Sequence, residues 1–162
     1  MSFHRVYLDT NILIAFLGED SDHQLAMALS EVIEAVAARD MQPYVTSELA
    51  LAEMLVRPMR AGVDLFSIDN VLTTSAWLEV VPVSRSVLWG AANLRSQHKN
   101  LKLPDAIHIA TSLAKRCSHL LTADNGLHGK YQIKHNENIG VVVDTIRPDL
   151  RTLESLIDWQ RP

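Results

Sequence analysis

The chain has 162 residues, 48% hydrophobic and 21% charged, with a formal net charge of −4. These values are typical of one soluble globular domain, so we predict a single domain over residues 1–162. The one cysteine, Cys117, excludes an internal disulfide and favours the cytoplasm. The apolar run at residues 12–17 is far shorter than the roughly 20 residues that cross a bilayer, so no membrane contact is expected.

Short apolar segments alternate with helical ones along the chain. The expected strands are residues 5–9, 44–46, 78–81, 119–122 and 140–144. The expected helices begin at Thr10 or Asn11 and then cover residues 22–39, 47–57, 62–74, 84–98, 104–116 and 148–159. Pro58 is expected to end the third helix. This order predicts an α/β fold with a short, mostly parallel central sheet flanked by helices on both faces.

Asp9 directly follows the first expected strand and precedes Thr10 and Asn11. Open α/β sheets place their chemistry at the carboxyl ends of strands, and right-handed crossovers bring those ends to one edge. Asp is also a common cap at a helix start. The position of Asp9 alone therefore leaves a catalytic and a capping role open.

Glu53 lies in the apolar stripe of the expected helix 47–57, on the same face as Leu49 and Val56. A carboxylate on an inward face is costly unless something pairs with it, whereas one at the border of the stripe reaches water. Glu48 in the first turn is interpreted instead as a favourable charge for the helix dipole.

Two further acids stand at comparable places. Asp105 follows Pro104 in the first turn of a helix that is apolar nearly all round, and Asp124 follows the strand 119–122. Locally, a dipole role explains Asp105 and an Asx turn explains Asp124. His108, one turn after Asp105, is interpreted as a hydrogen-bonded core histidine because the histidines and the cysteine show no zinc-site spacing.

Taken together, Asp9, Glu53, Asp105 and Asp124 indicate a shared site, because the predicted sheet brings them to one edge. Clustered carboxylates repel one another unless a cation neutralises them. Mg²⁺ or Mn²⁺ prefers oxygen ligands and suits the hydrolysis of a phosphodiester. Thr10, Asn11 and Thr122 are expected to hold carboxylates or the attacking water. The repulsion also predicts that Asp9→Asn or Asp105→Asn stabilises the metal-free chain by ~1 kcal/mol.

Positive charge is concentrated in residues 95–136, whose net charge is +5 against −9 for the remainder. Five of the seven histidines also lie there. A basic segment holding two isolated acids suits a polyanionic substrate over a metal site, and solvated surface charge explains the same composition. The basic residues are Arg95, Lys99, Lys102, Lys115, Arg116, Lys130 and Lys134, and the histidines are His98, His108, His119, His128 and His135.

Four segments resemble the motifs of PIN-domain ribonucleases, and in particular the VapC-type toxins of type II toxin–antitoxin pairs. The similarity covers nearly the whole chain, and the third motif is the most specific. The segments are Asp9-Thr10-Asn11-Ile12, Ser47 through Glu53, Leu103 through Ala110, and Leu121-Thr122-Ala123-Asp124. The acids of the family correspond to Asp9, Glu53, Asp105 and Asp124, with Thr122 as the hydroxyl residue near the fourth.

This resemblance implies a Mg²⁺- or Mn²⁺-dependent endoribonuclease that cuts structured RNA, such as tRNA or rRNA. It also implies a separately encoded antitoxin, whose tail enters the acidic groove, and a homodimer. Several apolar side chains are candidates for dimer or antitoxin packing, with plain core as the alternative for each. They are Leu65, Phe66, Val71, Leu72 and Trp77.

Three other classes compete with this interpretation. A haloacid-dehalogenase-like phosphatase also begins with an acid at a strand end, but it needs Asp-x-Asp, and Asn11 stands at the second acidic position. A phosphate-accepting receiver domain needs an early acidic pair, and none precedes Asp9. A non-catalytic module that binds RNA or protein stays open, although four intact acids favour an enzyme.

Overall fold

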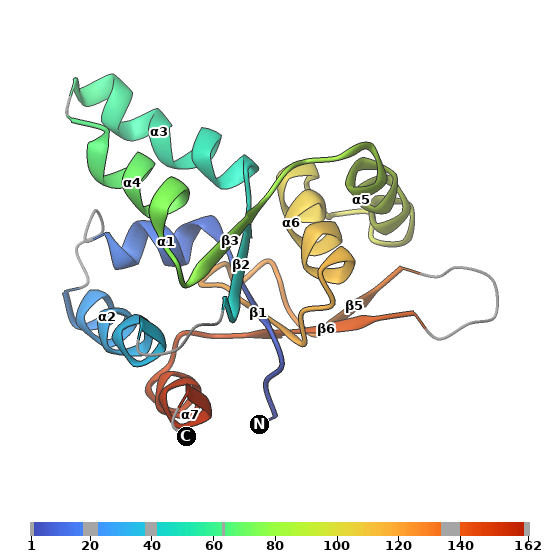
Figure 1. The fold of residues 1–162 in the computed structure, drawn as a ribbon. Coiled ribbons are helices and arrows are strands. Elements are labelled where there is room, and N and C mark those ends of the chain that lie inside the picture. Colours follow the sequence, from blue (N-terminus) through green and yellow to red (C-terminus); the bar gives the residue numbers. More distant parts are fainter. Residues whose placement is uncertain (1, 18–22, 38–41, 63, 134–139, 161–162) are drawn as a thin grey trace.

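The computed structural model describes residues 2–17, 23–37, 42–62, 64–133 and 140–160 (Figure 1). Its strands are β1 (Val6–Leu8), β2 (Tyr44–Ser47), β3 (Leu78–Val81), β4 (His119–Leu121), β5 (Lys130–Gln132) and β6 (Val142–Ile146). Its helices are α1 (Thr10–Phe16), α2 (His23–Ala37), α3 (Leu49–Ala61), α4 (Phe66–Thr74), α5 (Arg85–Gln97), α6 (Leu103–Ala114) and α7 (Leu150–Gln160). Residues 22, 38 and 39 of the expected second helix lie outside the described residues.

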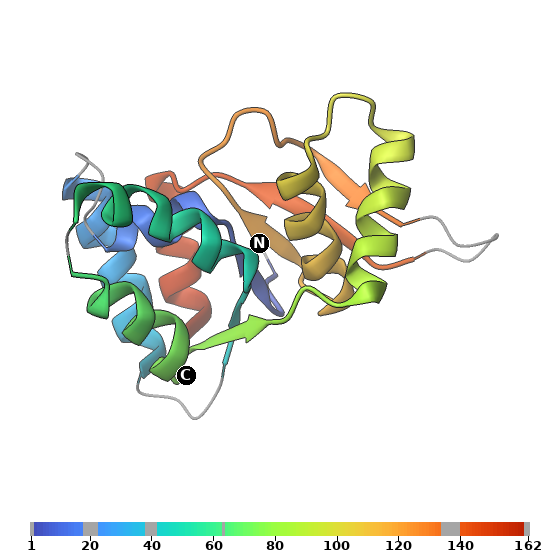
Figure 2. The ribbon, with the colours of Figure 1, turned by 90° about the horizontal axis from the view of Figure 1, so that it is seen from above.

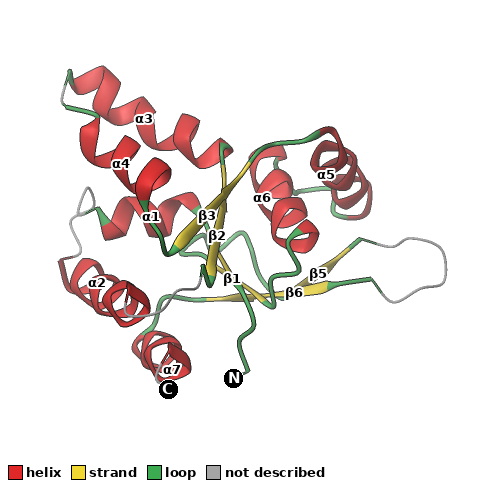
Figure 3. Ribbon diagram, viewed as in Figure 1, coloured by secondary structure: helices red, strands yellow, loops and turns green. Residues whose placement is uncertain are grey.

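The strands form one sheet in the order β3-β2-β1-β4-β6-β5 (Figure 3). Every neighbouring pair is parallel except β5 and β6, which pair antiparallel at one edge. Strand β1 lies between β2 and β4, with Val6 opposite both Tyr44 and His119. The α/β prediction with a mostly parallel sheet is therefore confirmed.

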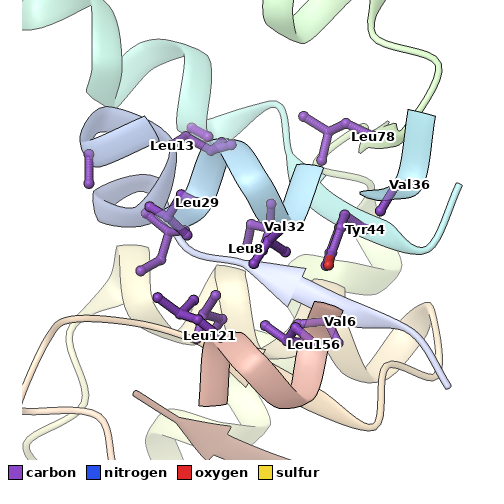
Figure 4. Close-up of a cluster of buried hydrophobic side chains, with 14 of the residues drawn as sticks. Val6, Leu8, Leu13, Leu29, Val32, Val36, Tyr44, Leu78, Leu121 and Leu156 are labelled. Carbon is purple, nitrogen blue, oxygen red and sulfur yellow. The ribbon is translucent and has the colours of Figure 1, made fainter. Parts of the chain in front are cut away.

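Side chains alternate across the sheet and build two cores. Val6 and Leu8 of β1 join the cluster formed with α1, α2 and α7, which Figure 4 shows in part. Tyr7 points to the other face, into the cluster formed with α5 and α6. Figures 1 and 2 show α5 and α6 on the opposite side of the sheet from α2 and α7. Because β1 is buried on both faces, all three of its side chains are apolar or aromatic.

The prediction that Pro58 ends the third helix is wrong. Helix α3 continues to Ala61 with Pro58 buried inside it, and it ends at Gly62, whose φ of 65° is left-handed. A proline near the end of a helix removes few backbone hydrogen bonds, and glycine adopts the left-handed cap without strain. Gly62 therefore ends α3 instead of beginning α4, which starts at Phe66.

Strand β5 was not predicted, and β6 begins and ends two residues later than expected, at Val142–Ile146 instead of 140–144. Only Tyr131 of the three residues of β5 is buried. A single buried residue gives no periodicity that the sequence could show. This edge strand is defined by its pairing with β6 instead. None of the helices that the structure describes has the length and apolar character needed to span a membrane.

Candidate active site

Asp9 lies at the carboxyl end of β1, where it is also the N-cap of α1. Its carboxylate accepts three hydrogen bonds, and its side chain is only 9% exposed. The donors are the backbone N–H of Thr10 at 2.8 Å, the Asn11 Nδ2 at 2.6 Å and the Thr122 Oγ1 at 2.6 Å. The capping role and a fixed orientation at the sheet edge are thus two results of the same geometry.

Glu53 extends from α3 to Thr10 and His108, half-buried, with 32% of its side chain exposed. Its Oε2 accepts a hydrogen bond from the Thr10 hydroxyl and lies 3.0 Å from the His108 Nε2. Burial raises the pKa of Glu53, but hydrogen bonds from His108 and Thr10, together with the charge of His108, outweigh burial and lower the pKa below its ordinary value. Glu53 is therefore held as a carboxylate.

Asp105 stands in the first turn of α6, where Pro104 fits the opening of the helix. Burial raises its pKa, and the negative charges of Asp124 and Asp9 raise it further, while Lys102 and His108 lower it. Asp105 is thus close enough to both acids to be repelled by them. Burial is the largest cause of the raised pKa, and repulsion by the two acids adds to it.

Asp124 lies in the loop after β4 and forms the Asx turn that its sequence suggests, because its Oδ1 accepts the N–H of Gly126 at 2.7 Å. Its own N–H donates to the Thr122 Oγ1 at 3.0 Å. The Arg147 guanidinium, from beyond β6, donates to the carbonyl oxygens of Thr122, Asp124 and Leu127. Asp124 therefore has the turn role that its local sequence predicts, and Arg147 holds the loop that carries it in place.

The predicted site residues are joined in two ways. Thr10 bonds to both Asp9 and Glu53, so these two acids are connected through one residue. Asp105 is repelled by the charges of Asp124 and Asp9, and the Thr122 hydroxyl bonds to both the Asp9 carboxylate and the backbone N–H of Asp124. Among the described residues no acid of the four hydrogen-bonds another. The supporting residues predicted, Thr10, Asn11 and Thr122, all contact the Asp9 carboxylate.

The carboxylates of the four acids are suitable ligands for a hard divalent cation whose remaining ligands are water and substrate. In the part of the chain that is described, no three histidine, cysteine or acidic side chains form a ready-made metal cage. Mg²⁺ does not require one, because one or two carboxylates usually hold it with waters and substrate phosphates. Carboxylate oxygens are its preferred ligands, and the repulsion that raises the pKa of Asp105 is what a cation would relieve.

His108 was predicted as a hydrogen-bonded core histidine, and its position agrees: it is 2% exposed, with Tyr7 and Glu53 as partners. Sequence reasoning missed that one of these partners is a candidate site acid. It also missed Arg147, whose three carbonyl contacts depend on a loop conformation. The spacing of Asp105 and His108, one turn apart, was the available signal for His108.

Four of the five interface candidates divide into two groups. Val71, Leu72 and Trp77 pack against the larger core cluster, which favours the plain core interpretation for them. Phe66 is 69% exposed at the start of α4 and stays a candidate for contact with another chain. Of the basic segment, Lys134 and His135 lie outside the described residues.

The fold is that of an α/β protein with a mostly parallel sheet, and Asp9 and Asp124 follow the carboxyl ends of its neighbouring strands β1 and β4. The model of the PIN domain matches residues 6–132, and this chain therefore belongs to the PIN domain family. Family membership overturns the phosphatase and receiver-domain alternatives. No curated protein matches the chain.

Solved structures agree with this assignment. A toxin–antitoxin complex from Klebsiella pneumoniae is similar with a TM-score of 0.53 and 25% identity, over 74% of this chain and 86% of that chain. VapC20 of Mycobacterium tuberculosis, a toxin that cleaves the sarcin–ricin loop, has a TM-score of 0.56 and 18% identity, over 74% of this chain and 90% of that chain. FitAcB from Neisseria gonorrhoeae has a TM-score of 0.52 and 18% identity, over 75% of this chain and 88% of that chain.

Proposed function

We propose that this chain is a metal-dependent endoribonuclease, the toxin of a type II toxin–antitoxin pair, which hydrolyses phosphodiester bonds in structured RNA. The observation that carries the proposal is the linkage of acids around Asp9: Thr10 hydrogen-bonds to both Asp9 and Glu53, and the Thr122 hydroxyl bonds to both Asp9 and the backbone N–H of Asp124. Burial, and then the charges of Asp124 and Asp9, raise the pKa of Asp105 beside them. Such a cluster repels a phosphate until a cation is bound. Membership of the PIN domain family and similarity to VapC20 support the same activity.

The proposed catalytic and metal-binding residues are Asp9, Glu53, Asp105 and Asp124. Bound Mg²⁺ or Mn²⁺ supplies an activated water and neutralises charge on the scissile phosphate. Thr122 and Asn11 hold the Asp9 carboxylate in place, and their bonds reduce the reorganisation that ligand binding requires. The lowered pKa of Glu53 keeps its carboxylate ionised and able to bind a cation.

The test is an RNA cleavage assay with the purified chain, using tRNA and rRNA fragments with Mn²⁺, Mg²⁺ or EDTA. We expect cutting with either metal and none in EDTA. Asp105→Asn and Glu53→Gln should abolish it, whereas Glu34→Gln, at an exposed acid of α2, should cut as wild type does. Equal cutting by the site variants would refute the assignment. A wild-type chain that binds RNA without cutting it with either metal would support the non-catalytic alternative.

The proposed partners are the RNA substrate, an antitoxin and a second copy of this chain, all met in the cytoplasm. Similarity to a toxin–antitoxin complex at 25% identity supports the antitoxin, and the exposed Phe66 offers an apolar contact. Induced expression should arrest growth for the wild type and not for Asp9→Asn. Light scattering should give twice the monomer mass; a monomer mass would remove the dimer from the proposal.

A further inference from the structure

Tyr7, His108, Glu53 and Thr10 form a continuous hydrogen-bonded chain through the centre of the fold. The Tyr7 hydroxyl lies 2.7 Å from the His108 Nδ1, and the His108 Nε2 lies 3.0 Å from the Glu53 Oε2. The Thr10 hydroxyl donates to the same oxygen. Four elements, β1, α6, α3 and α1, each contribute one member. Tyr7 is 0% and His108 2% exposed, so the chain connects the core to the site.

The chemistry of these groups fixes the direction of the bond to Glu53. A carboxylate only accepts hydrogen bonds, so the His108 Nε2 must carry a proton to lie 3.0 Å from it. This holds for the neutral and for the charged ring. In the neutral ring the Nδ1 accepts a hydrogen bond from the Tyr7 hydroxyl 2.7 Å away, and in the charged ring the Nδ1–H donates to the same hydroxyl.

His108 thereby gives the two oxygens of Glu53 different roles. Among the described residues, the Oε2 receives both hydrogen bonds of this carboxylate, from His108 and Thr10, and the Oε1 receives none. The side chain is 32% exposed, so the Oε1 is the oxygen left for a ligand. The His108 Nε2 is also 4.0 Å from the Asp9 Oδ1, which puts a donor between two candidate ligands.

We propose that His108, oriented by Tyr7, is a positioning residue that holds Glu53 with one oxygen anchored and one oxygen free for the divalent ion. This inference rests on the proposed function, because it takes Glu53 as a ligand. An apolar side chain would fill the core without the cost of burying two polar groups. Removal of a hydrogen-bond partner of a metal ligand typically lowers metal affinity by about 10- to 100-fold.

The test measures Mn²⁺ affinity of the purified full chain by calorimetry, without RNA. His108→Gln keeps an amide donor at the place of the Nε2, and His108→Asn puts it at the place of the Nδ1. We expect His108→Asn to weaken Mn²⁺ binding by about 10- to 100-fold. His108→Gln should recover most of that loss, and Tyr7→Phe should lose an intermediate amount of affinity. Melting curves establish that each variant is folded.

A double-mutant cycle separates positioning from a general structural role. In a Glu53→Gln background, His108→Asn should not weaken Mn²⁺ binding further, because its effect passes through the Glu53 carboxylate. Equal affinity of His108→Asn and His108→Gln, or the same loss in both backgrounds, overturns the inference while leaving the nuclease proposal intact. A wild-type chain that binds no Mn²⁺ also overturns the inference, and the RNA cleavage assay with Mn²⁺ and with EDTA then decides the nuclease proposal separately.

Discussion

The Thr122 hydroxyl donates a 2.6 Å hydrogen bond to the carboxylate of Asp9, and this bond joins the carboxyl ends of the neighbouring strands β1 and β4. The same hydroxyl accepts the N–H of Asp124 at 3.0 Å and the Asn11 Nδ2 at 3.2 Å. Thr122 is 0% exposed, so water does not replace these partners. One hydroxyl thus links two predicted site acids to each other.

Thr122→Val keeps the shape of this side chain and removes its hydroxyl. The Asp9 carboxylate would lose one donor and the Asp124 N–H its acceptor, so we expect a loss of about 1–3 kcal/mol in the free energy of unfolding. Urea denaturation measures it. Thr122→Ser, which retains the hydroxyl, is the control and should lose less. A valine variant with the urea midpoint of the wild type would contradict the prediction.

Asp9→Asn is expected to destabilise the metal-free chain, which reverses the sign predicted from charge repulsion alone. All three donors around the carboxylate need an acceptor, and the amide group of Asn would turn a donor toward one of them. The cost should be about 1–3 kcal/mol. Melting curves in EDTA test this, and a variant that melts above the wild type would show that repulsion dominates at Asp9.

Asp105→Asn should instead stabilise the metal-free chain, by at most about 1 kcal/mol, because solvent screens this half-exposed group. The pKa of Asp105 is raised on folding from 3.8. Its ionised form therefore destabilises the fold above the folded pKa, and this cost disappears as the pH falls toward 3.8. The gain in the free energy of unfolding from Asp105→Asn should therefore be greatest at neutral pH.

Addition of Mn²⁺ should shrink or reverse the advantage of Asp105→Asn, because a cation neutralises the charges that repel Asp105. Melting curves at neutral and acid pH, with EDTA and with Mn²⁺, provide the four conditions. An advantage that is unchanged by pH would mean that Asp105 acts through packing or capping and not through charge.

Glu53 should contribute stability with the opposite pH dependence. Its pKa is lowered on folding from 4.5, because the bonds from His108 and Thr10 outweigh the effect of burial. The contribution is therefore present above pH 4.5 and is lost as the pH falls through the folded pKa. Urea denaturation across the acid range should show a smaller decline for Glu53→Gln than for the wild type. Parallel declines would contradict the prediction.

Arg147→Ala should loosen the loop that carries Asp124. The Arg147 guanidinium donates to the carbonyl oxygens of Thr122, Asp124 and Leu127, which would lose a charged donor. Hydrogen exchange of the amides of residues 122–127 should accelerate, more than in Arg85→Ala, at an exposed arginine at the start of α5. Unchanged exchange in this loop would show that other contacts hold it.

Much of the fold follows from the sequence, because its signals are local. The alternation of buried strands with helices predicts a parallel sheet, and the position of Asp9 after a strand places it at the carboxyl edge. The motif around Asp105 predicts a central helix, and α6 is buried from Ala106 to Leu113. These inferences need only neighbours along the chain.

The partners of each acid were decided only by tertiary structure. The bond from Thr122 to Asp9 and that from His108 to Glu53 join residues 113 and 55 positions apart, and no local pattern encodes them. The same holds for β5, which pairs with β6, and for Pro58, which α3 accommodates. Sequence determined which residues carry charge and which elements present them. Packing decided whether a carboxylate is held by donors, as at Asp9, or repelled by other charges, as at Asp105, because those energies depend on distances across the sheet.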